Sequence, residues 1–251
     1  GQIPQNSGLT RPIKIIAPEG CLANPIFPAP VIARFCPGNA LADTVMKAMA
    51  NAAPSKVSAG IGNLRVVAFT GGEGINQWVH MEIMEGSYGG RSGKDGMDAV
   101  DTLYANTRNN PIEDIESHLP LRVREYELRS AEAGAGEWRG GLGAVRTFEF
   151  LEDGAISIEG DGNKFKPWGL FGGCQGSTAK IILRHPNNDE ENLVSKIPYK
   201  KIVKKSQISA FGPNGGGYGL PKNRDKKLIL KDIEDEVITQ NIANKIYGNY
   251  G

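Results

Sequence analysis

The sequence predicts an α+β fold: a β-rich single domain with many short, mostly antiparallel strands, glycine-rich turns and a few helices. Two observations predict this class. Short runs in which apolar and polar residues alternate recur along the chain, as they do in strands that bury one face. The 251 residues also include 33 glycines and 15 prolines with no three-residue period, which indicates frequent tight turns.

The expected strands extend over most of the chain. A first short strand at residues 11–20 leads into a proline-rich, extended arm. Further along, short apolar runs are separated by glycine, and many such runs with few helices are typical of an α+β fold. The runs expected to form these later strands are residues 64–69, 78–85, 121–129, 147–150, 155–160, 179–185 and 205–211.

Three helices are expected beside these strands. The clearest covers residues 40–54, where the apolar residues recur at helical spacing. Asn39 is the expected N-cap of this helix, and Pro54 is expected to end it. Short helices are also expected at residues 112–119 and 241–251.

The composition argues against several classes of protein. A formal net charge of +1 gives no electrostatic case for binding nucleic acid or an anionic membrane. No apolar run reaches the roughly 18–20 residues that span a bilayer. The three cysteines, Cys21, Cys36 and Cys174, have no CxxC spacing, so we expect neither a disulfide framework nor a zinc ribbon. A reducing, cytoplasmic location is therefore expected.

One basic cluster, at residues 196–207, stands apart from this charge balance. It is expected to be a solvated edge strand, because lysine at the edge of a sheet prevents unwanted pairing. Contact with a phosphate group or with a partner is the alternative. The near-neutral total charge favours the edge strand.

The sequence contains no local motif for nucleophilic catalysis, nucleotide binding or metal binding. There is no GxSxG elbow and no GxxxxGK[ST] loop. In the segment GAGEWRGGLG, Gly140 falls one residue too late for a GxGxxG motif. The three histidines, His80, His118 and His185, show no HxH or HExxH spacing, so this chain is expected to bind no metal.

The segment GAGEWRGGLGAV, residues 134–145, is expected to be a compact structural connection. Its glycines permit positive φ angles and close approach of backbones, and Trp138 would anchor it by burial. The planar guanidinium of Arg139 would bind neighbouring carbonyl or carboxylate groups. The alternative is that the backbone N–H groups form an anion-binding nest for a phosphorylated intermediate.

His80 and Glu82 are the first candidate site residues, because they share one face of a predicted strand, opposite an apolar face. They would form an acid–base pair or one side of a substrate pocket. The structural alternative is a solvent-exposed face or a subunit contact.

Further acidic side chains lie on a predicted helix and in predicted turns. Glu113 and Glu116 are three residues apart on the helix, so they are neighbours on its surface, and they are either catalytic or ordinary exposed charges. Asp95 in SGKDGMD and Asp161 in EGDGN each precede a glycine, for which a tight turn is the structural interpretation.

A set of longer segments covers nearly the whole chain. In order, they are NSGLTRPIKIIAPEGCLANPIFPAPVIARF, LADTVMKAMANAAP, NTRNNPIEDIESHLPLRVREYELR, GAGEWRGGLGAVR, KPWGLFGGCQG, GPNGGGYGLPKNRD and NKIYG. Together, and in this order, they resemble the hydantoinase B/oxoprolinase family. Residues 1–251 are therefore expected to form a hydantoinase B/oxoprolinase C-terminal domain.

This resemblance implies a role in an ATP-dependent enzyme complex. Relatives include N-methylhydantoinase, 5-oxoprolinase, caprolactamase, and acetone and acetophenone carboxylases. The implied mechanism has two stages: an ATPase subunit phosphorylates a carbonyl or enol oxygen of the substrate, and the activated species then reacts in the B-type subunit. Hydrolysis of a cyclic amide of the hydantoin or oxoproline type is the expected reaction. Ketone carboxylation, or a non-catalytic scaffold role for this half, is the alternative.

The resemblance also implies partner chains and their cofactors. The matching segments resemble only the C-terminal half of the family's subunit, whose catalytic metal ligands lie in the N-terminal half. We therefore expect a separate chain that carries that half with a divalent metal, zinc, manganese or iron. We also expect a hydantoinase A-type ATPase subunit that binds ATP and magnesium. This chain would join them in a hetero-oligomer and would alone be inactive, without a cofactor of its own.

The site residues are assigned by combining the residue patterns with this resemblance. In one departure, Gly162 follows Asp161 where the family commonly has arginine, so an anion contact at that position would be missing. The expected catalytic residues are Glu82, Asp95, Glu113 and Glu116. The expected substrate-binding residues are His80, Asn106, Arg139 and Asp161.

Overall fold

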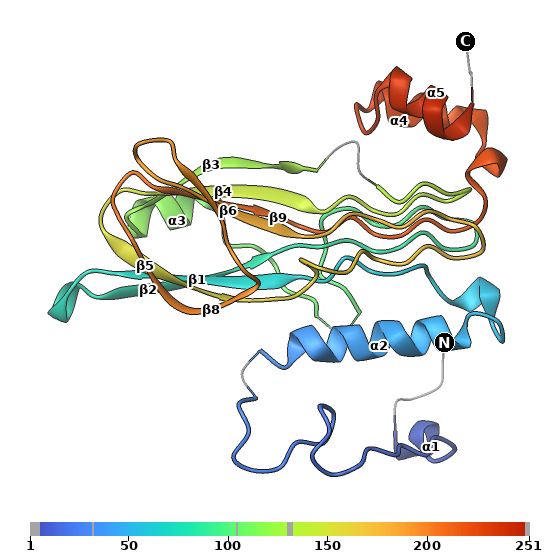
Figure 1. Ribbon diagram of the computed structural model, residues 1–251, viewed down its shortest axis with the longest axis horizontal. Helices are drawn as coiled ribbons and strands as arrows, with labels where there is room; N and C mark the ends of the chain where they lie inside the picture. The colour runs from blue at the N-terminus through green and yellow to red at the C-terminus, as the bar shows by residue number, and fades with distance from the viewer. Residues whose placement is uncertain (1–5, 32, 104, 130–132, 249–251) are drawn as a thin grey trace. The chain divides into compact units, whose positions relative to one another are not determined.

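The computed structural model describes residues 6–31, 33–103, 105–129 and 133–248 (Figure 1). The chain divides into two compact units, Gly1–Arg34 and Phe35–Gly251. Over the described part of the chain, no helix combines the length and the apolar character needed to cross a membrane.

The first unit contains one short helix and no strand among its described residues. This helix, α1 (Ser7–Thr10), is capped by the Asn6 side chain, which accepts a hydrogen bond from the Gly8 amide. The strand expected at residues 11–20 is wrong: no strand of the described residues pairs with this stretch, and a strand needs a ladder partner. Ile15, within the stretch, is 85% exposed.

The second unit is built on two antiparallel sheets that pack face to face (Figure 1). One sheet has the order β2-β1-β5-β8, with β1 at Arg65–Gly71, β2 at Trp78–Met84, β5 at Gly154–Glu159 and β8 at Lys196–Ile202. The other has the order β3-β4-β9-β6-β7, with β3 at Leu121–Leu128, β4 at Ala144–Phe150, β6 at Lys180–Arg184, β7 at Glu190–Asn192 and β9 at Gln207–Phe211. The predicted α+β class with short antiparallel strands is confirmed.

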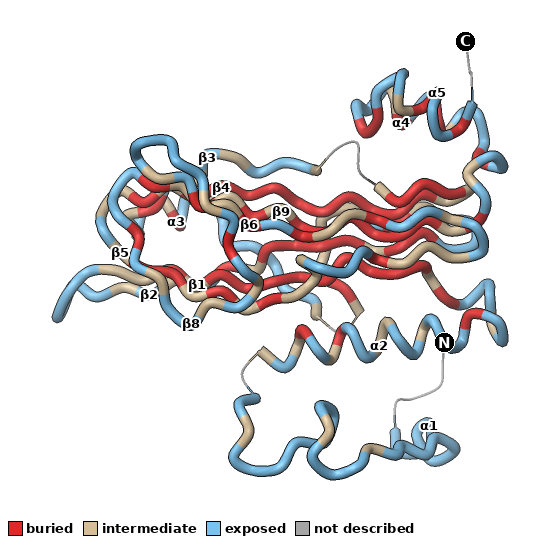
Figure 2. Tube along the Cα trace, in the orientation of Figure 1, coloured by how far each residue is buried: buried red, intermediate tan, exposed pale blue. Residues whose placement is uncertain are grey.

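The hydrophobic core of this unit lies between the two sheets (Figure 2). The ring of Phe69 on β1 lies against those of Phe148 and Phe150 on β4, with centroids 4.8 and 5.9 Å away. Alternate residues of β5, β6 and β9 complete the cluster. The predicted helix α3 (Ile112–His118) packs against β3 and adds Ile115 to the core.

Two predictions about single elements have different outcomes. The basic residues 196–207 include β8, which is an edge strand, as predicted. The long helix α2 (Phe35–Met49) begins before the predicted N-cap, so Asn39 lies inside the helix and its side-chain amide binds Asn63 instead. Pro37 does not prevent this early start, because a proline in the first turn of a helix removes no intrahelical hydrogen bond.

The strand β2 buries its polar face and exposes its apolar face. Val79 and Met81 are 68% and 64% exposed, whereas His80 and Glu82 point between the sheets, where Glu82 is buried. The solvent-exposed alternative for His80 and Glu82 is therefore wrong. Polar side chains inside a sandwich must find partners there, because an unpaired buried charge is costly.

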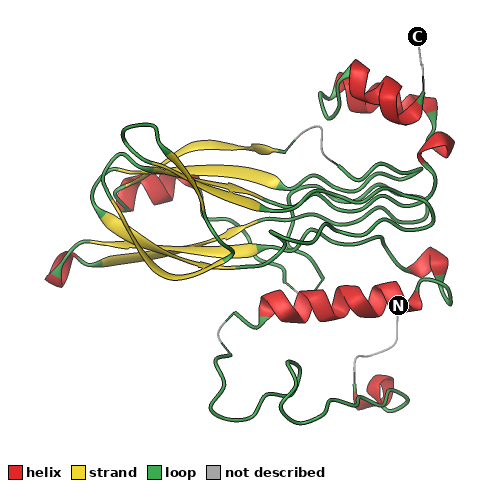
Figure 3. Cartoon of the chain, in the orientation of Figure 1, coloured by secondary structure: helices red, strands yellow, loops and turns green. Residues whose placement is uncertain are grey.

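Beyond the sheets, extended glycine-rich segments run side by side without forming strands (Figure 3). In the stretch 215–218, each of three successive residues binds different neighbouring segments, and the fourth returns to the segment that the first one binds. This pattern matches the three residues per turn of a polyproline II helix, whereas successive residues of a strand alternate between two directions. The hydrogen-bond partners are residues 134 and 141 for Gly215, 60 and 90 for Gly216, 170 and 174 for Gly217, and 138 for Tyr218.

Glycine is required in this stretch because the segments lie too close for a side chain. A Cβ atom on Gly215, Gly216 or Gly217 would lie 2.2, 2.0 or 2.1 Å from a backbone oxygen of a neighbouring segment. Residues 134–145 belong to the same arrangement: a Cβ atom on Gly140 would lie 1.9 Å from the Gly215 oxygen. The prediction that this segment is a compact structural connection is confirmed, but Trp138 is only half-buried, so its expected burial is wrong.

Two C-terminal helices, α4 (Lys226–Glu234) and α5 (Gln240–Tyr247), form a second small core with the segment 134–145. Ile229 of α4 and Leu142 are both buried in this core. The helix α5 was predicted, whereas α4 was not. The described residues of the unit also form three short 3-10 helices, η1 (Pro54–Lys56), η2 (Gly74–Asn76) and η3 (Pro221–Asn223).

Candidate functional site

The buried polar face of β2 carries part of a charged cluster, which we call the Arg146 cluster: His80, Glu82, Glu85 and Arg146. His80 Nε2 lies 2.7 Å from Glu82 Oε1, and Glu82 Oε2 accepts a hydrogen bond of 2.7 Å from Arg146 Nη1. Arg146 comes from β4 in the facing sheet, and its side chain is almost completely buried. Charge-assisted hydrogen bonds therefore join the two sheets at this point.

Two aromatic rings flank the guanidinium of Arg146. Its central carbon lies 4.6 Å from the ring centroid of Tyr126 and 5.1 Å from that of Phe148, distances at which cation–π contacts are favourable. Within the described residues, Nε and Nη2 of Arg146 have no hydrogen-bond partner. The guanidinium is thus held in place, while the N–H groups of two of its nitrogens donate to no described residue.

Glu85, which follows β2 directly, is held less firmly than Glu82. Its Oε1 lies 3.7 Å from Arg146 Nη1, and neither of its carboxylate oxygens has a hydrogen-bond partner among the described residues. The residue is nevertheless only 5% exposed. Burial raises the pKa of Glu85, and the nearby charge of Arg146 opposes that rise without cancelling it.

A cavity of about 550 Å³ opens beside Glu85, and we call it the Glu85 cavity. Most of its wall comes from residues 97, 99–101, 103 and 105–109, which include Asp101, Asn106, Arg108 and Asn109. Its volume lies within the range of about 300–1,000 Å³ that is usual for small-molecule sites. Of the predicted substrate-binding residues, Asn106 lines this cavity, and His80 belongs to the neighbouring Arg146 cluster.

The wall of the Glu85 cavity contains strained and unsatisfied groups. Ala99 and Leu103 have φ angles of 43° and 56°, in the left-handed region that residues with a side chain rarely adopt. Asp101 Oδ1 is buried and has no hydrogen-bond partner within the described part of the chain. Such features concentrate at binding sites, where the surrounding structure holds them in place.

Asp95 and Arg139 lie in a different charged group, with Asp98, Arg224 and Asp232, which we call the Arg224 network. Arg224 binds the two oxygens of Asp95 at 2.8 Å each and Asp232 at 2.7 Å. Arg139 binds Asp98 at 3.0 Å and Asp232 at 3.1 Å. Burial lowers the pKa of Arg224, but the facing carboxylates outweigh it and raise the pKa above its ordinary value. The network attaches residues 134–145 to α4.

The backbone amides of residues 134–145 are engaged as well. The amides of Arg139 and Leu142 donate to Asp95 and Asp98 at 2.7 Å each, and the Gly143 amide donates to Asn214 at 2.7 Å. Others in the segment donate to backbone oxygens of neighbouring segments. Because these amides already have acceptors, the anion-nest alternative has no support in the structure.

Asp161 lies beside another cavity, of about 440 Å³, at α2. Its two carboxylate oxygens accept hydrogen bonds of 3.1 Å from Asn63, and burial raises its pKa. Asp43 of α2 lines the same cavity and accepts a hydrogen bond of 2.6 Å from the Trp168 indole. Burial raises the pKa of Asp43 to about 6. Gly162, also in the wall, has a φ of 79°, a conformation that suits glycine.

Glu113 and Glu116 lie on α3 and line none of the cavities described here. Glu113 is exposed. Glu116 Oε1 accepts a hydrogen bond of 2.9 Å from the Val123 amide, which fastens α3 to β3. The structure therefore does not bring these two carboxylates together with Glu82 or Asp95.

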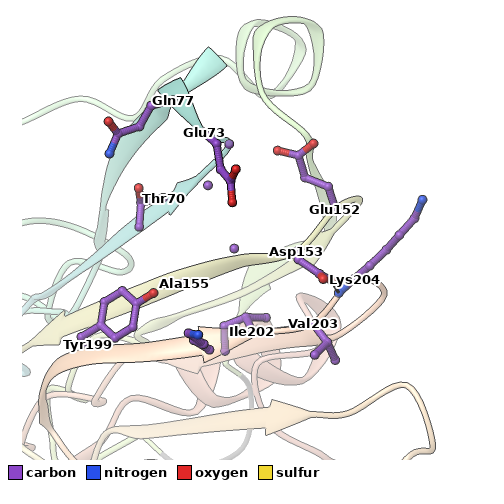
Figure 4. A pocket seen from close by; sticks show the side chains of 14 residues that line it. Thr70, Glu73, Gln77, Glu152, Asp153, Ala155, Tyr199, Ile202, Val203 and Lys204 are labelled. Atoms are coloured by element: carbon purple, nitrogen blue, oxygen red, sulfur yellow. Dashed lines mark hydrogen bonds between the residues drawn. The ribbon is translucent and has the colours of Figure 1, made fainter. Parts of the chain in front are cut away.

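The largest of these cavities, about 780 Å³, is an open groove at the ends of β1, β5 and β8 (Figure 4). Figure 4 shows Glu73 and Glu152 on one side of this groove and Tyr199 on the other. Glu152 accepts a hydrogen bond of 2.8 Å from the Trp78 indole. None of the predicted site residues lines this groove.

The described residues do not assemble a group of three or more His, Cys, Asp or Glu side chains that would hold a metal ion. The cysteines Cys21, Cys36 and Cys174 are free thiols. Burial raises the pKa of Cys36 to about 12, so its thiol is protonated at neutral pH.

A profile of the hydantoinase B/oxoprolinase family matches residues 1–221. The chain belongs to this family. A protein of Pseudomonas sp. (strain NS671), named as the putative B subunit of a D-/L-hydantoinase, is 57% identical over 249 residues, which are 99% of this chain and 42% of that protein. The chain thus spans less than half the length of this relative.

Two solved structures share the fold. The ATP-dependent caprolactamase of Pseudomonas jessenii matches 98% of this chain and 45% of its own, with a TM-score of 0.84 and 26% identity. An acetone carboxylase in its nucleotide-free form matches 83% of this chain and 32% of its own, with a TM-score of 0.66 and 16% identity. The second likeness concerns the fold alone.

Two members of the Arg146 cluster, Glu85 and Arg146, are absent from the sequence predictions. Arg146 directly precedes the predicted strand at residues 147–150 and lies 64 residues from Glu82, and no local pattern joins the two. Glu85 follows the last residue of β2, where the alternation of faces no longer says which way a side chain points. Within the sequence, the alternation that placed His80 and Glu82 on one face was the one pattern that pointed to members of the Arg146 cluster.

Proposed function

We propose that this chain is part of the B-type subunit of an ATP-dependent enzyme complex that hydrolyses a cyclic amide of the hydantoin or oxoproline type. The observation that carries the proposal is the 57% identity with the putative hydantoinase protein of Pseudomonas sp. across 99% of the chain. The match to a caprolactamase over 98% of the chain supports it, because that enzyme's name also specifies a cyclic amide.

Opening a ring amide requires water to attack the carbonyl carbon, a base to take the water proton and an acid to protonate the leaving nitrogen. Phosphorylation of the carbonyl oxygen by ATP makes the carbon a better electrophile. The Arg146 cluster offers two carboxyl groups with different surroundings, Glu82 between Arg146 and His80, and Glu85 without a close partner. Carboxyl groups in unlike environments are suited to unlike roles in proton transfer.

In this proposal, the other parts of the complex supply the cofactors. The remaining part of the B-type subunit, carried by a separate N-terminal chain, would hold a divalent zinc, manganese or iron ion. A hydantoinase A-type ATPase subunit would bind ATP and magnesium. The described residues of this chain assemble no metal-ligand group, so we assign no step to a metal that it holds. The free cysteines fit a cytoplasmic complex.

The other two functions have weaker support. Ketone carboxylation rests on the acetone carboxylase, whose likeness at 16% identity concerns the fold alone. A purely structural role fits the Arg224 network and the glycine-rich segments. It does not account for the unsatisfied side chains around the Glu85 cavity.

The test is ATP turnover by the complex purified with this chain from its source. Hydantoin, 5-oxoproline, acetone and acetophenone are added separately, and released phosphate and ring-opened product are measured. We expect turnover that depends on hydantoin or 5-oxoproline, with one ring-opened product for each substrate consumed. Turnover that depends on a ketone and bicarbonate would show a carboxylase instead. Purification of the chain alone and monomeric would contradict the proposed complex.

A further inference from the structure

We infer that an exposed apolar stripe on α2 is the surface on which the N-terminal half of the B-type subunit docks. The stripe consists of Leu41, Val45, Ala48 and Met49, and we call it the α2 stripe. The inference rests on the proposed function, because it takes the N-terminal half from the proposed complex. It goes further by naming the surface of this chain that the N-terminal half covers.

The helix α2 is amphipathic, but its apolar face points away from its own unit. The four residues of the α2 stripe recur at helical spacing, so they share one face of the helix. Leu41, Val45 and Met49 are 55%, 56% and 47% exposed, and Ala48 is exposed as well. Most of α2 is exposed or half-buried (Figure 2). A helix ordinarily buries its apolar face, so an exposed stripe indicates contact with another surface.

Hydrogen bonds from the opposite, more polar side of α2 fix the helix in this orientation. The side-chain amide of Asn39, which is fully buried, donates to Asn63 Oδ1 at 3.0 Å. The carboxylate of Asp43 accepts hydrogen bonds from the Ile61 amide at 3.2 Å and from the Trp168 indole at 2.6 Å. Turning the α2 stripe inward would break all three bonds and leave buried polar groups unpaired, which is costly. The stripe therefore stays on the outside of its unit.

The residues that directly precede α2 present further exposed apolar side chains. Ile13, Ile15, Ile16 and Phe27 are 63%, 85%, 76% and 93% exposed. No described residue of the first unit is buried, so this apolar segment has no core of its own. Large exposed apolar side chains that follow one another closely are typical of a surface that binds a protein. The first unit thus has the same need for a partner as the α2 stripe.

The extent of the relatives favours the N-terminal half as that partner. The stretch that matches this chain is 42% of the relative from Pseudomonas sp. and 45% of the caprolactamase, so more than half of each lies outside the match. The resemblance to the C-terminal half of the family's subunit implies that this remainder comes before the matched stretch. The first unit and α2 are then its nearest neighbours in sequence, and elements consecutive in a chain are usually adjacent in space.

The α2 stripe is too small for a stable contact between two copies of this chain. A helix of 15 residues is roughly 22 Å long and presents a face about 10 Å wide, so two such faces bury about 440 Å² in total. Specific interfaces bury about 1,200–2,000 Å². A larger partner reaches this area by covering other apolar side chains as well. The stripe also lacks charged residues, as does the core of a permanent interface.

Photo-crosslinking in the assembled complex identifies the occupant of the α2 stripe. Val45 is replaced by p-benzoylphenylalanine, the complex is irradiated, and the cross-linked chain is identified by mass spectrometry. We expect a cross-link to the N-terminal half. A cross-link to the ATPase subunit, to a second copy or within this chain would overturn the inference. Val194, a valine that is 64% exposed between β7 and β8, is the matched control. Equal cross-linking from both positions would also overturn it.

A charge placed in the α2 stripe tests whether the contact contributes to binding. In Val45→Glu, docking would bury a carboxylate without a partner, so we expect the Kd of this chain for the N-terminal half to rise about 10- to 100-fold. Val194→Glu should bind as wild type does. Glutamate is a good helix former, so the thermal unfolding of this chain by itself should not change in Val45→Glu. A large fall in its Tm would show that the stripe is already buried in this chain and would overturn the inference.

The outcomes separate this inference from the proposed function. If the purified complex contains no N-terminal half, or shows no turnover that depends on a cyclic amide, the proposed function fails. If the complex assembles and turns over hydantoin but Val45→Glu binds the N-terminal half as wild type does, this inference alone is overturned.

Discussion

The Arg146 cluster and the Arg224 network are built from the same kinds of side chain, and each leaves an arginine nitrogen without a partner among the described residues, yet they differ in how many hydrogen bonds their carboxylates complete. In the Arg224 network, both oxygens of Asp95, Asp98 and Asp232 accept hydrogen bonds. In the Arg146 cluster, Glu85 accepts none from the described residues. A buried charge with complete bonding is a means of holding segments together. A buried charge with unused bonding capacity beside a cavity marks a candidate binding site.

The largest expected effect concerns the Arg224 network. Replacing Arg224 by methionine removes the cation that Asp95 and Asp232 share and leaves both carboxylates underpaired. Breaking a buried ion pair in this way is expected to lower the free energy of unfolding by about 3–5 kcal/mol. Urea titration followed by circular dichroism measures this loss in the free energy of unfolding. Lys222→Met, at an exposed lysine two residues away, is the control, with an expected change below about 0.5 kcal/mol.

The next effect concerns an intermediate case, Asp43, which has hydrogen-bond partners and a pKa raised from 3.8 to about 6 by burial. A carboxyl group whose pKa is higher in the folded state opposes folding once it ionises. The contribution of the neutral Asp43 carboxyl group to the free energy of unfolding is therefore lost as pH rises from about 4 to about 6. We expect the free energy of unfolding of wild type, relative to Asp43→Asn, to fall by about 3 kcal/mol across this window. Parallel curves for the two proteins would refute the assignment.

Glycine substitutions test whether the Arg224 network depends on the glycine-rich segments beside it. Alanine at Gly216 places its Cβ 2.0 Å from the Trp168 oxygen, and the resulting overpacking is expected to cost about 1–3 kcal/mol. Gly93→Ala is the control for backbone conformation, because Gly93 has a φ of 83° and open space around its Cβ position. Thermal unfolding should show the larger loss for Gly216→Ala. Equal losses would mean that close packing is not the cause.

The smallest effect has the opposite sign and compares the two regions directly. Glu85→Gln removes a buried carboxyl group without a partner, so stability should rise by about 0.5–1 kcal/mol at neutral pH, and the gain should grow as pH increases. Asp232→Asn removes a carboxylate with two cationic partners and should lower stability. Urea titration of both variants checks this. A loss at both positions would remove the distinction between the two regions.

Sequence patterns locate most strands because alternation is a local property, but they do not say which face is buried, since β2 buries its polar face, and they missed the short strand β7. Alternation locates most strands, and lysines mark β8 as an edge. The strand expected at residues 11–20 is wrong because alternation says nothing about whether a partner strand exists. The helix α2 begins earlier than its predicted N-cap, because a proline such as Pro37 is tolerated in the first turn of a helix.

The candidate site is less predictable because its contacts join residues far apart in the chain. The shared strand face brings Glu82 and His80 together, but Arg146 lies 64 residues from Glu82. Arg224 lies 129 residues from Asp95. Unless this partner is known, the sequence around Asp95 indicates only an acidic residue in a turn. The composition of a segment suggests which residues need partners, and only the fold shows whether they have them.

The threefold arrangement of residues 215–218 has a consequence for insertions and deletions. In a strand, losing one residue turns every later side chain to the opposite face, and losing two restores the pattern. Here, each residue faces a different neighbour, so losing one residue shifts every later hydrogen bond by a third of a turn, and losing two shifts it by two thirds. Only a change of three residues returns each amide to the same neighbouring segment. Length variation in this part of the chain should therefore come in multiples of three or be confined to the turns that connect the segments.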